Sequence, residues 1–250
     1  MKIFTRTTFA SARVIMALAV FFCHVFPSIN MLGPLFVGVF FFMSGYGMEF
    51  NRYRAQSLYR VIPYILVFLV YSLVYYLLFR VWIYPSSWFL VMYFFIMLLY
   101  RFISYFRLLV IAFLLMGLLL PRLGFELAWV ASVGSFLYGV WFSRHPYRFT
   151  IISCLKFLPL MVLFFFHVDI FFWGILPLFT LIVFHISSRL SFISFLGRYT
   201  FHFYCSHCLF LGLLGATWTL GGSPTVPMVA FAFFLTCVFS YVMKEGFVKW

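Results

Sequence analysis

The segment 61-VIPYILVFLVYSLVYYLLF-79 decides the fold class of this chain, because it contains no charged residue and no polar–apolar alternation. Lipid offers the backbone no hydrogen bonds, so only helices and closed barrels cross a bilayer. An apolar run of roughly 17 to 25 residues crosses as a helix, whereas barrel strands alternate polar and apolar side chains. The segment therefore predicts a transmembrane helix.

The composition extends this prediction to the whole chain. Of 250 residues, 66% are hydrophobic, 25% aromatic and only 8% charged, and the mean hydropathy is +1.14. A soluble domain is about half apolar and about a quarter charged. We therefore expect an all-α, polytopic integral membrane helix bundle, with residues 1–250 forming a single transmembrane domain without an appended soluble domain.

Hydropathy divides the chain into about ten predicted spans. The first is expected to be retained, since no small-residue cleavage site follows it. The predicted spans cover residues 11–28, 33–49, 61–79, 84–100, 107–121, 126–143, 149–167, 169–187, 200–219 and 225–243.

Basic residues give this bundle a predicted orientation. Lys and Arg concentrate in cytoplasmic loops, and here basic-rich and basic-poor loops alternate. Arg52, Arg54 and Arg60 follow the second span, whereas 28-SINMLG-33 contains no basic residue. Both termini are thus predicted to be cytoplasmic. The formal net charge of +13 then faces anionic lipid of the inner leaflet, and no nucleic-acid partner is implied.

Arg13 and Lys156 are the two cations that fall inside predicted spans, and all four acids lie at span ends or in loops. Lys156 is expected to extend toward the cytoplasmic surface. Arg13 shares its span with His24. Eleven helical residues rotate by about 1,100° and rise about 16 Å, so both side chains are predicted to point in nearly the same direction at different depths.

Cysteine and histidine also gather in 202-HFYCSHC-208, where Cys205 and Cys208 share a helix face. Zinc sites usually add a second pair of ligands from elsewhere, and the sequence shows no such pair. We therefore expect no metal site. His207 is expected to be shallower than His24, because it lies near the predicted cytoplasmic end of its span.

The second span combines bulky aromatics with small residues, which favour close helix packing. The small residues are Gly38, Ser44, Gly45 and Gly47. The arginines that follow can bind lipid headgroups or the phosphates of a nucleotide-like ligand.

These features together resemble the membrane-bound acyltransferase-3 family, the O-acyltransferases of bacterial surface glycans. The resemblance rests on Arg13 and His24 at their spacing, on four further motifs and on the ten-span layout. The motifs are 40-FFFMSGY-46, 52-RYRAQSLYRVIP-63, 86-SSWFLV-91 and 194-SFLGRYTFHFYCSH-207. Two departures are a fourth span without the glutamate that many relatives carry and a shorter chain without an extracytoplasmic catalytic domain.

The resemblance implies transfer of an acyl group, most often acetyl, from cytoplasmic acyl-CoA to a hydroxyl of a cell-envelope or exported glycan. The enzyme would lie in the bacterial inner membrane, with acetyl-CoA as co-substrate and no permanently bound cofactor. His24 would be the general base, since a neutral imidazole suits that role near pH 7, although an acetyl-histidine intermediate is an alternative. Residues implied in donor binding are Arg13, Arg52, Arg60, Ser44 and Tyr46, with Trp88 as a further site residue.

The developing oxyanion requires a hydrogen-bond donor, for which Ser44, Tyr46 and His207 are candidates. A different class of function fits the same composition, namely a transporter or flippase of an anionic or lipid-linked sugar. Transporter folds often contain two repeats, and residues 1–125 and 126–250 show none. A third hypothesis is that the chain is a non-catalytic scaffold.

Overall fold

The computed structural model is built from helices throughout the part of the chain that it describes, and no strand occurs there. This confirms the all-α prediction. The described residues are 4–50, 62–80, 92, 94–96, 100, 108, 111, 115, 128–159 and 171–247. They divide into two compact units, one of residues 1–33, 64–87 and 184–250, the other of residues 34–63 and 88–183.

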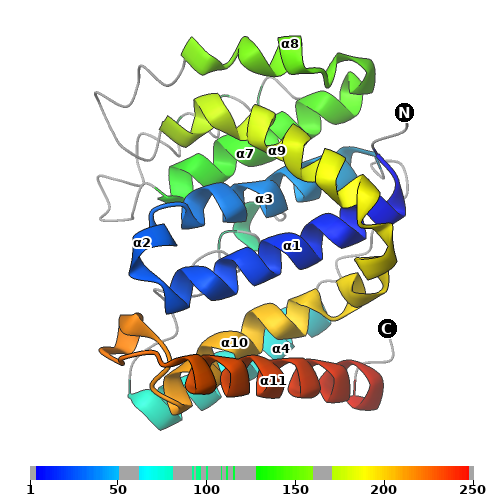
Figure 1. Cartoon of the computed structure of the whole chain (residues 1–250). Helices are drawn as coiled ribbons and strands as arrows, with labels where there is room; N and C mark the ends of the chain where they lie inside the picture. Colours follow the sequence, from blue (N-terminus) through cyan, green and yellow to red (C-terminus); the bar gives the residue numbers. More distant parts are fainter. Residues whose placement is uncertain are drawn as a thin grey trace. The chain divides into compact units, whose positions relative to one another are not determined.

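The first unit contains the longest apolar helices. Within it, α10 packs against both α1 and α11, and η6 packs along α1 (Figure 1). Its elements are α1 (Arg6–Val25), α2 (Pro27–Asn30), α4 (Ile62–Phe79, from Tyr64), η6 (Ser191–Arg198), α10 (Thr200–Leu213), η7 (Trp218–Leu220), α11 (Val226–Val242) and the π-helical turn η8 (Met243–Phe247).

The second unit is organised around two helices that pack closely through glycines. A Cβ atom at Gly45 would overlap the carbonyl of Phe136, and one at Gly139 would overlap the carbonyl of Phe42. Its elements are α3 (Gly33–Phe50, from Pro34), α7 (Ala128–Arg144), η3 (Pro146–Arg148) and α8 (Ile151–Leu155); α9 (Phe171–Arg189) begins in this unit and ends in the first.

The predicted role of small residues in the second span is confirmed at two positions. Gly45 meets the α7 backbone, and a Cβ at Gly38 would lie 2.7 Å from a methyl of Leu176. No described atom lies within 4 Å of a Cβ built at Gly47, and Ser44 donates to the carbonyl of Phe40 in its own helix, at 2.8 Å. Glycine at these contacts lets the backbones approach as in packed membrane helices.

Three of the described helices are long and apolar enough to cross a membrane, namely Arg6–Val25, Ile62–Phe79 and Val226–Gly246. A fourth candidate combines Gly174–Arg189 with Ser191–Arg198, which are bent by 103°. Large apolar side chains along α4 are exposed, among them Leu66 (57%), Val70 (61%) and Leu73 (54%). Such a surface suits lipid and is unfavourable in water, so the fold has the character of a membrane protein.

Five predicted spans coincide within a few residues with described helices. These spans are 33–49, 61–79, 126–143, 169–187 and 225–243, which correspond to α3, α4, α7, α9 and α11. The predicted spans 84–100 and 107–121 fall almost wholly outside the described residues.

The first span was predicted over 11–28, but α1 covers Arg6–Val25. Thr5 caps its start by accepting a hydrogen bond from the backbone N–H of Thr8 at 3.1 Å. Phe26 is extended, with φ −113° and ψ 108°, immediately before Pro27. A residue that precedes proline disfavours the helical conformation, which ends the helix there.

The prediction of one continuous helix over 149–167 is wrong in its described part. Phe149 lies outside the helix, α8 ends at Leu155, and Lys156 follows with an exposed side chain. Pro159 lacks the N–H that would bond to the carbonyl of Leu155, and its ring would clash with that carbonyl. Lys156 therefore lies beyond the end of a short helix rather than inside a long one.

The predicted span 200–219 is also shortened, because α10 ends at Leu213. Gly215 adopts φ +62°, the left-handed conformation that commonly closes a helix. The backbone N–H of Ala216 then bonds to the carbonyl of Leu211 at 2.8 Å. The chain continues as the separate turn η7.

Candidate functional site

The end of α1 is anchored by two hydrogen bonds from η7 and the residue before it. Thr217 Oγ1 donates to the carbonyl of His24 at 2.9 Å, and Trp218 Nε1 donates to the carbonyl of Cys23 at 3.0 Å. The last carbonyls of a helix have no partner inside the helix. These side chains provide partners and thereby fix the backbone that carries His24.

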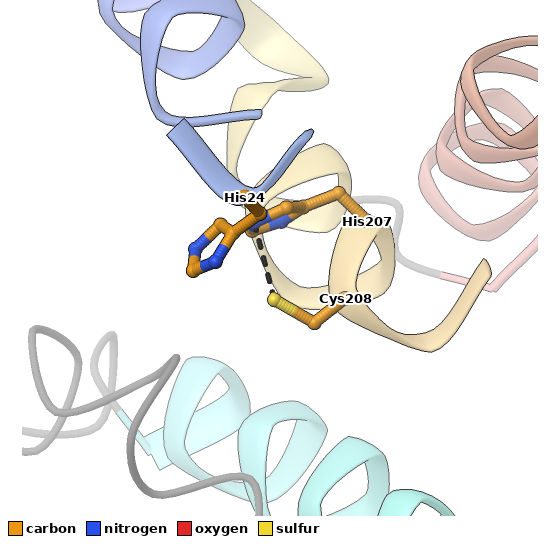
Figure 2. Close-up of side chains that lie close together, drawn as sticks. All are labelled: His24, His207 and Cys208. Atoms are coloured by element: carbon orange, nitrogen blue, oxygen red, sulfur yellow. Dashed lines mark hydrogen bonds between the residues drawn. The ribbon is translucent and has the colours of Figure 1, made fainter. Parts of the chain in front are cut away.

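The opposing wall of this site is α10, whose residues from His202 to Cys208 are all buried. Its His207 ring lies 5.1 Å from the His24 ring, centroid to centroid, with an angle of 44° between the planes (Figure 2). Phe21 and Phe203 lie 6.3 Å from the same ring. The two imidazoles thus meet among aromatic side chains.

The hydrogen bonds of His207 define its tautomer. Its Nδ1 lies 2.6 Å from the carbonyl of Tyr204, and a carbonyl only accepts, so Nδ1 carries the proton. In the neutral ring Nε2 is then an unprotonated acceptor. Cys208 Sγ lies 3.2 Å from Nε2, so the thiol donates to the imidazole.

His24 differs from His207 in its hydrogen bonding. Its Nδ1 is buried and has no hydrogen-bond partner within the described part of the chain. Ligand atoms of His24, His207 and Cys208 all lie within 4.8 Å of one another. We call these three residues the histidine cluster. Buried polar atoms are usually paired, so an unpaired imidazole nitrogen here is available to a ligand or a reacting group.

The expected depth difference between the two histidines is absent, since their rings are neighbours. The reason lies at the other end of the helices. Gly197, just before α10, packs against the backbone and Cβ of Ala10, so α10 begins beside the first turns of α1. Ser11 Oγ also donates to the carbonyl of Leu190 at 3.0 Å.

The remaining predicted site residues are distributed differently. Arg13 lies on α1 with an exposed side chain, and so it is not a buried cation. Ser44 and Tyr46 lie on α3 in the second unit. Arg52, Arg60 and Trp88 lie outside the described residues.

One role inferred from the sequence changes with this geometry, and one further residue joins the site. His207 was a candidate oxyanion donor, but its N–H is directed to Tyr204, so the neutral ring offers an acceptor instead. Cys208 was not singled out as a site residue. Its signal in the sequence was its position directly after His207, which becomes informative only once α1 brings His24 to the same place.

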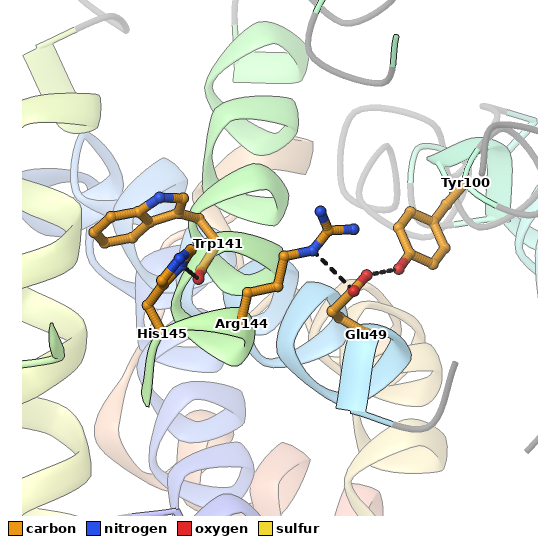
Figure 3. A network of polar contacts seen from close by, with 5 residues as sticks. All are labelled: Glu49, Tyr100, Trp141, Arg144 and His145. Atoms are coloured by element: carbon orange, nitrogen blue, oxygen red, sulfur yellow. Dashed lines mark hydrogen bonds and ion pairs between the residues drawn. The ribbon is translucent and has the colours of Figure 1, made fainter. Parts of the chain in front are cut away.

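A second polar cluster lies at the C-terminal end of α3 in the second unit. Arg144 Nε donates to Glu49 Oε1 at 2.9 Å, and the hydroxyl of Tyr100 donates to Glu49 Oε2 (Figure 3). We call Glu49, Tyr100 and Arg144 the carboxylate cluster. Beside it, Nδ1 of His145 lies 3.1 Å from the carbonyl of Trp141. Both carboxylate oxygens of Glu49 therefore have donors.

Comparisons of the chain with protein-family models, with curated proteins and with solved structures found no match.

Proposed function

We propose that this chain is a membrane-bound O-acyltransferase that moves an acyl group, most often acetyl, from cytoplasmic acyl-CoA to a hydroxyl of a cell-envelope glycan. The supporting observation is the contact between the imidazole rings of His24 and His207, whose centroids lie 5.1 Å apart. The sequence resemblance implied His24 as the general base and left His207 as one of three candidate oxyanion donors, and the two residues come from helices far apart in the chain.

In this proposal His24 is the general base. Its unpaired Nδ1 accepts the proton of the acceptor hydroxyl while that oxygen attacks the thioester carbon. The carbon–sulfur bond of acyl-CoA breaks, and the thiolate leaves and takes up a proton. A positioned imidazole contributes typically about 10²–10⁴-fold to such a step. His207, fixed by Tyr204, holds an acceptor nitrogen beside the base.

The donor would enter from the cytoplasm with its phosphates near Arg13, Arg52 and Arg60. Arginine binds phosphate through two parallel hydrogen bonds, which makes it suited to this role. Ser44 and Tyr46 remain proposed donor-binding residues, with Trp88 a further site residue. The protein would lie in a bacterial inner membrane as a multi-pass helix bundle, with both termini cytoplasmic.

Contacts inside each unit join helix ends that the sequence places on the same side of the membrane. In the first unit, Thr217 and Trp218 at the predicted outer end of span nine bond to the predicted outer end of span one. Arg198 pairs with Glu245 at 3.5 Å, and both are predicted to be cytoplasmic. In the second unit, Glu49 and Arg144 end spans that are predicted to run in the same direction.

The first test measures acetyl-CoA binding by thermal shift on detergent-purified protein, beside Arg13→Ala and His24→Ala. We expect saturable stabilisation that Arg13→Ala weakens and His24→Ala largely retains, because the base contacts the reacting atoms rather than the phosphates. Binding that survives loss of Arg13 would contradict its donor-binding role. A folded wild type that responds to no acyl-CoA would contradict the enzyme and favour a transporter.

A further inference from the structure

We propose that the histidine cluster binds a zinc-class transition-metal ion through one nitrogen each of His24 and His207 and the sulfur of Cys208. Their ligand atoms lie within 4.8 Å of one another (Figure 2). Zinc binds nitrogen at about 2.0–2.1 Å and sulfur at about 2.3 Å. A tetrahedral ion therefore requires ligand atoms about 3.3–3.6 Å apart, a contraction that side-chain rotation can supply.

The surroundings of His207 match those of a metal ligand. A ligating histidine almost always donates its other ring N–H to a carboxylate, a backbone carbonyl or a water. His207 Nδ1 makes this contact with the carbonyl of Tyr204 at 2.6 Å. The contact holds the ring and leaves the Nε2 lone pair directed toward Cys208, whose sulfur is 3.2 Å away.

The unpaired ring nitrogen of His24 is a second observation, independent of the contacts of His207, that points to a bound ligand. Its buried Nδ1 has no hydrogen-bond partner among the described residues, although its backbone is firmly held by Thr217. A histidine kept only for packing would ordinarily bond to a neighbour, because an unpaired buried polar atom is costly. His202 Nδ1 is also buried and unpaired, but among the described residues only His24 lies together with a second histidine and a thiol. A metal ion would satisfy this nitrogen. In the sequence, the only candidate metal ligands near His207 are those of 202-HFYCSHC-208. The fold adds His24 from α1.

Charge determines what else the site holds. Metal binding displaces the Cys208 proton to solvent, so a divalent ion with one thiolate and two neutral imidazoles carries a net charge of +1. An isolated charge is costly in apolar surroundings. Three protein ligands leave the fourth position open, as in catalytic zinc sites. An anionic oxygen, hydroxide or an alkoxide, would fill it and neutralise the site.

This site does not depend on acyl transfer, but it would deepen that proposal. With zinc bound, His24 is a ligand, and the ion lowers the pKa of the bound hydroxyl in place of a free imidazole base. The two proposals can fail separately: acetyl-CoA stabilisation tests the enzyme, whereas metal content tests the site.

The experiment measures zinc by elemental mass spectrometry in protein purified with a tag that contains neither histidine nor cysteine. We expect one zinc per chain in the wild type after extensive dialysis. His24→Ala, His207→Ala and Cys208→Ala should lose it. Matched controls for His207 and Cys208 are His202→Ala and Cys205→Ala, which remove buried residues of the same types from the same helix and should retain it.

Cobalt substitution gives a second readout. Co²⁺ added to metal-free protein should produce tetrahedral absorption bands and a thiolate charge-transfer band that Cys208→Ser removes. Circular dichroism confirms that each variant is folded. Zinc content that is negligible in folded wild type, or equal in wild type and Cys208→Ala, would overturn the proposal. Exclusive binding of Cu⁺ would overturn the zinc assignment.

Discussion

The carboxylate cluster and the histidine cluster are built from similar numbers of polar side chains but differ in how completely these are paired. In the carboxylate cluster both oxygens of Glu49 have donors, and Arg144 balances the charge. In the histidine cluster a buried nitrogen of His24 has no partner within the described residues. Fully paired groups stabilise helix contacts, whereas incompletely paired buried groups are candidates for chemistry.

The difference between the two clusters predicts that a substitution in the histidine cluster has its largest effect on catalytic activity. His24→Gln should reduce acyl transfer by about 10²–10⁴-fold, whether the imidazole acts as base or as metal ligand. Glu49→Gln should leave the turnover of correctly folded protein essentially unchanged. Release of CoA from acetyl-CoA in membranes measures both. Full activity in His24→Gln would remove the distinction between the clusters.

A large effect on stability is expected where α3 and α7 meet. Gly45→Ala should lower the free energy of unfolding by about 1–3 kcal/mol, because its Cβ would overlap the carbonyl of Phe136. Gly33→Ala is the control, since no described atom lies within 4 Å of its Cβ. Thermal unfolding in detergent compares them. Equal midpoints for the two variants would contradict the close approach of the helices.

The sequence predicted α3, α4 and α11 well because each is a long apolar run bounded by turn signals or basic residues. It failed where one residue ended a helix inside an apolar segment, as Pro27, Pro159 and Gly215 do. Hydropathy does not distinguish a helix from an apolar turn. These failures show that helix ends depended on local backbone chemistry rather than on composition.

The candidate site was predictable only in part. His24 and His207 were singled out from their positions and from the family resemblance, but their contact depends on how far α10 extends beside α1. That register is set by Gly197 against Ala10 and by the η7 contacts. Such long-range contacts leave no periodic signal in a single sequence, which is why Cys208 was missed.

Glu49→Gln should have a smaller effect on stability. The Glu49 side chain is 10% exposed and that of Arg144 is 30% exposed. Loss of this ion pair should therefore lower the free energy of unfolding by about 1–2 kcal/mol. Glu245→Gln breaks a much more exposed pair and should cost under about 0.5 kcal/mol. Chemical denaturation measures both. A larger loss for Glu245→Gln would contradict this ranking by burial.

The last prediction concerns the hydrogen bond that positions His24. Thr217→Val preserves shape but removes the donor to the His24 carbonyl, so the free energy of unfolding should fall by about 1 kcal/mol. The variant should also weaken Co²⁺ binding, because the carbonyl lies on the residue that supplies the ligand. Thr217→Ser retains the hydroxyl and should restore both properties. If Thr217→Val lowers stability while Co²⁺ affinity stays at the wild-type value, the bond holds the helix end together without positioning the imidazole. The position of the His24 imidazole would then depend on its packing against α10 rather than on the hydrogen bond that closes α1.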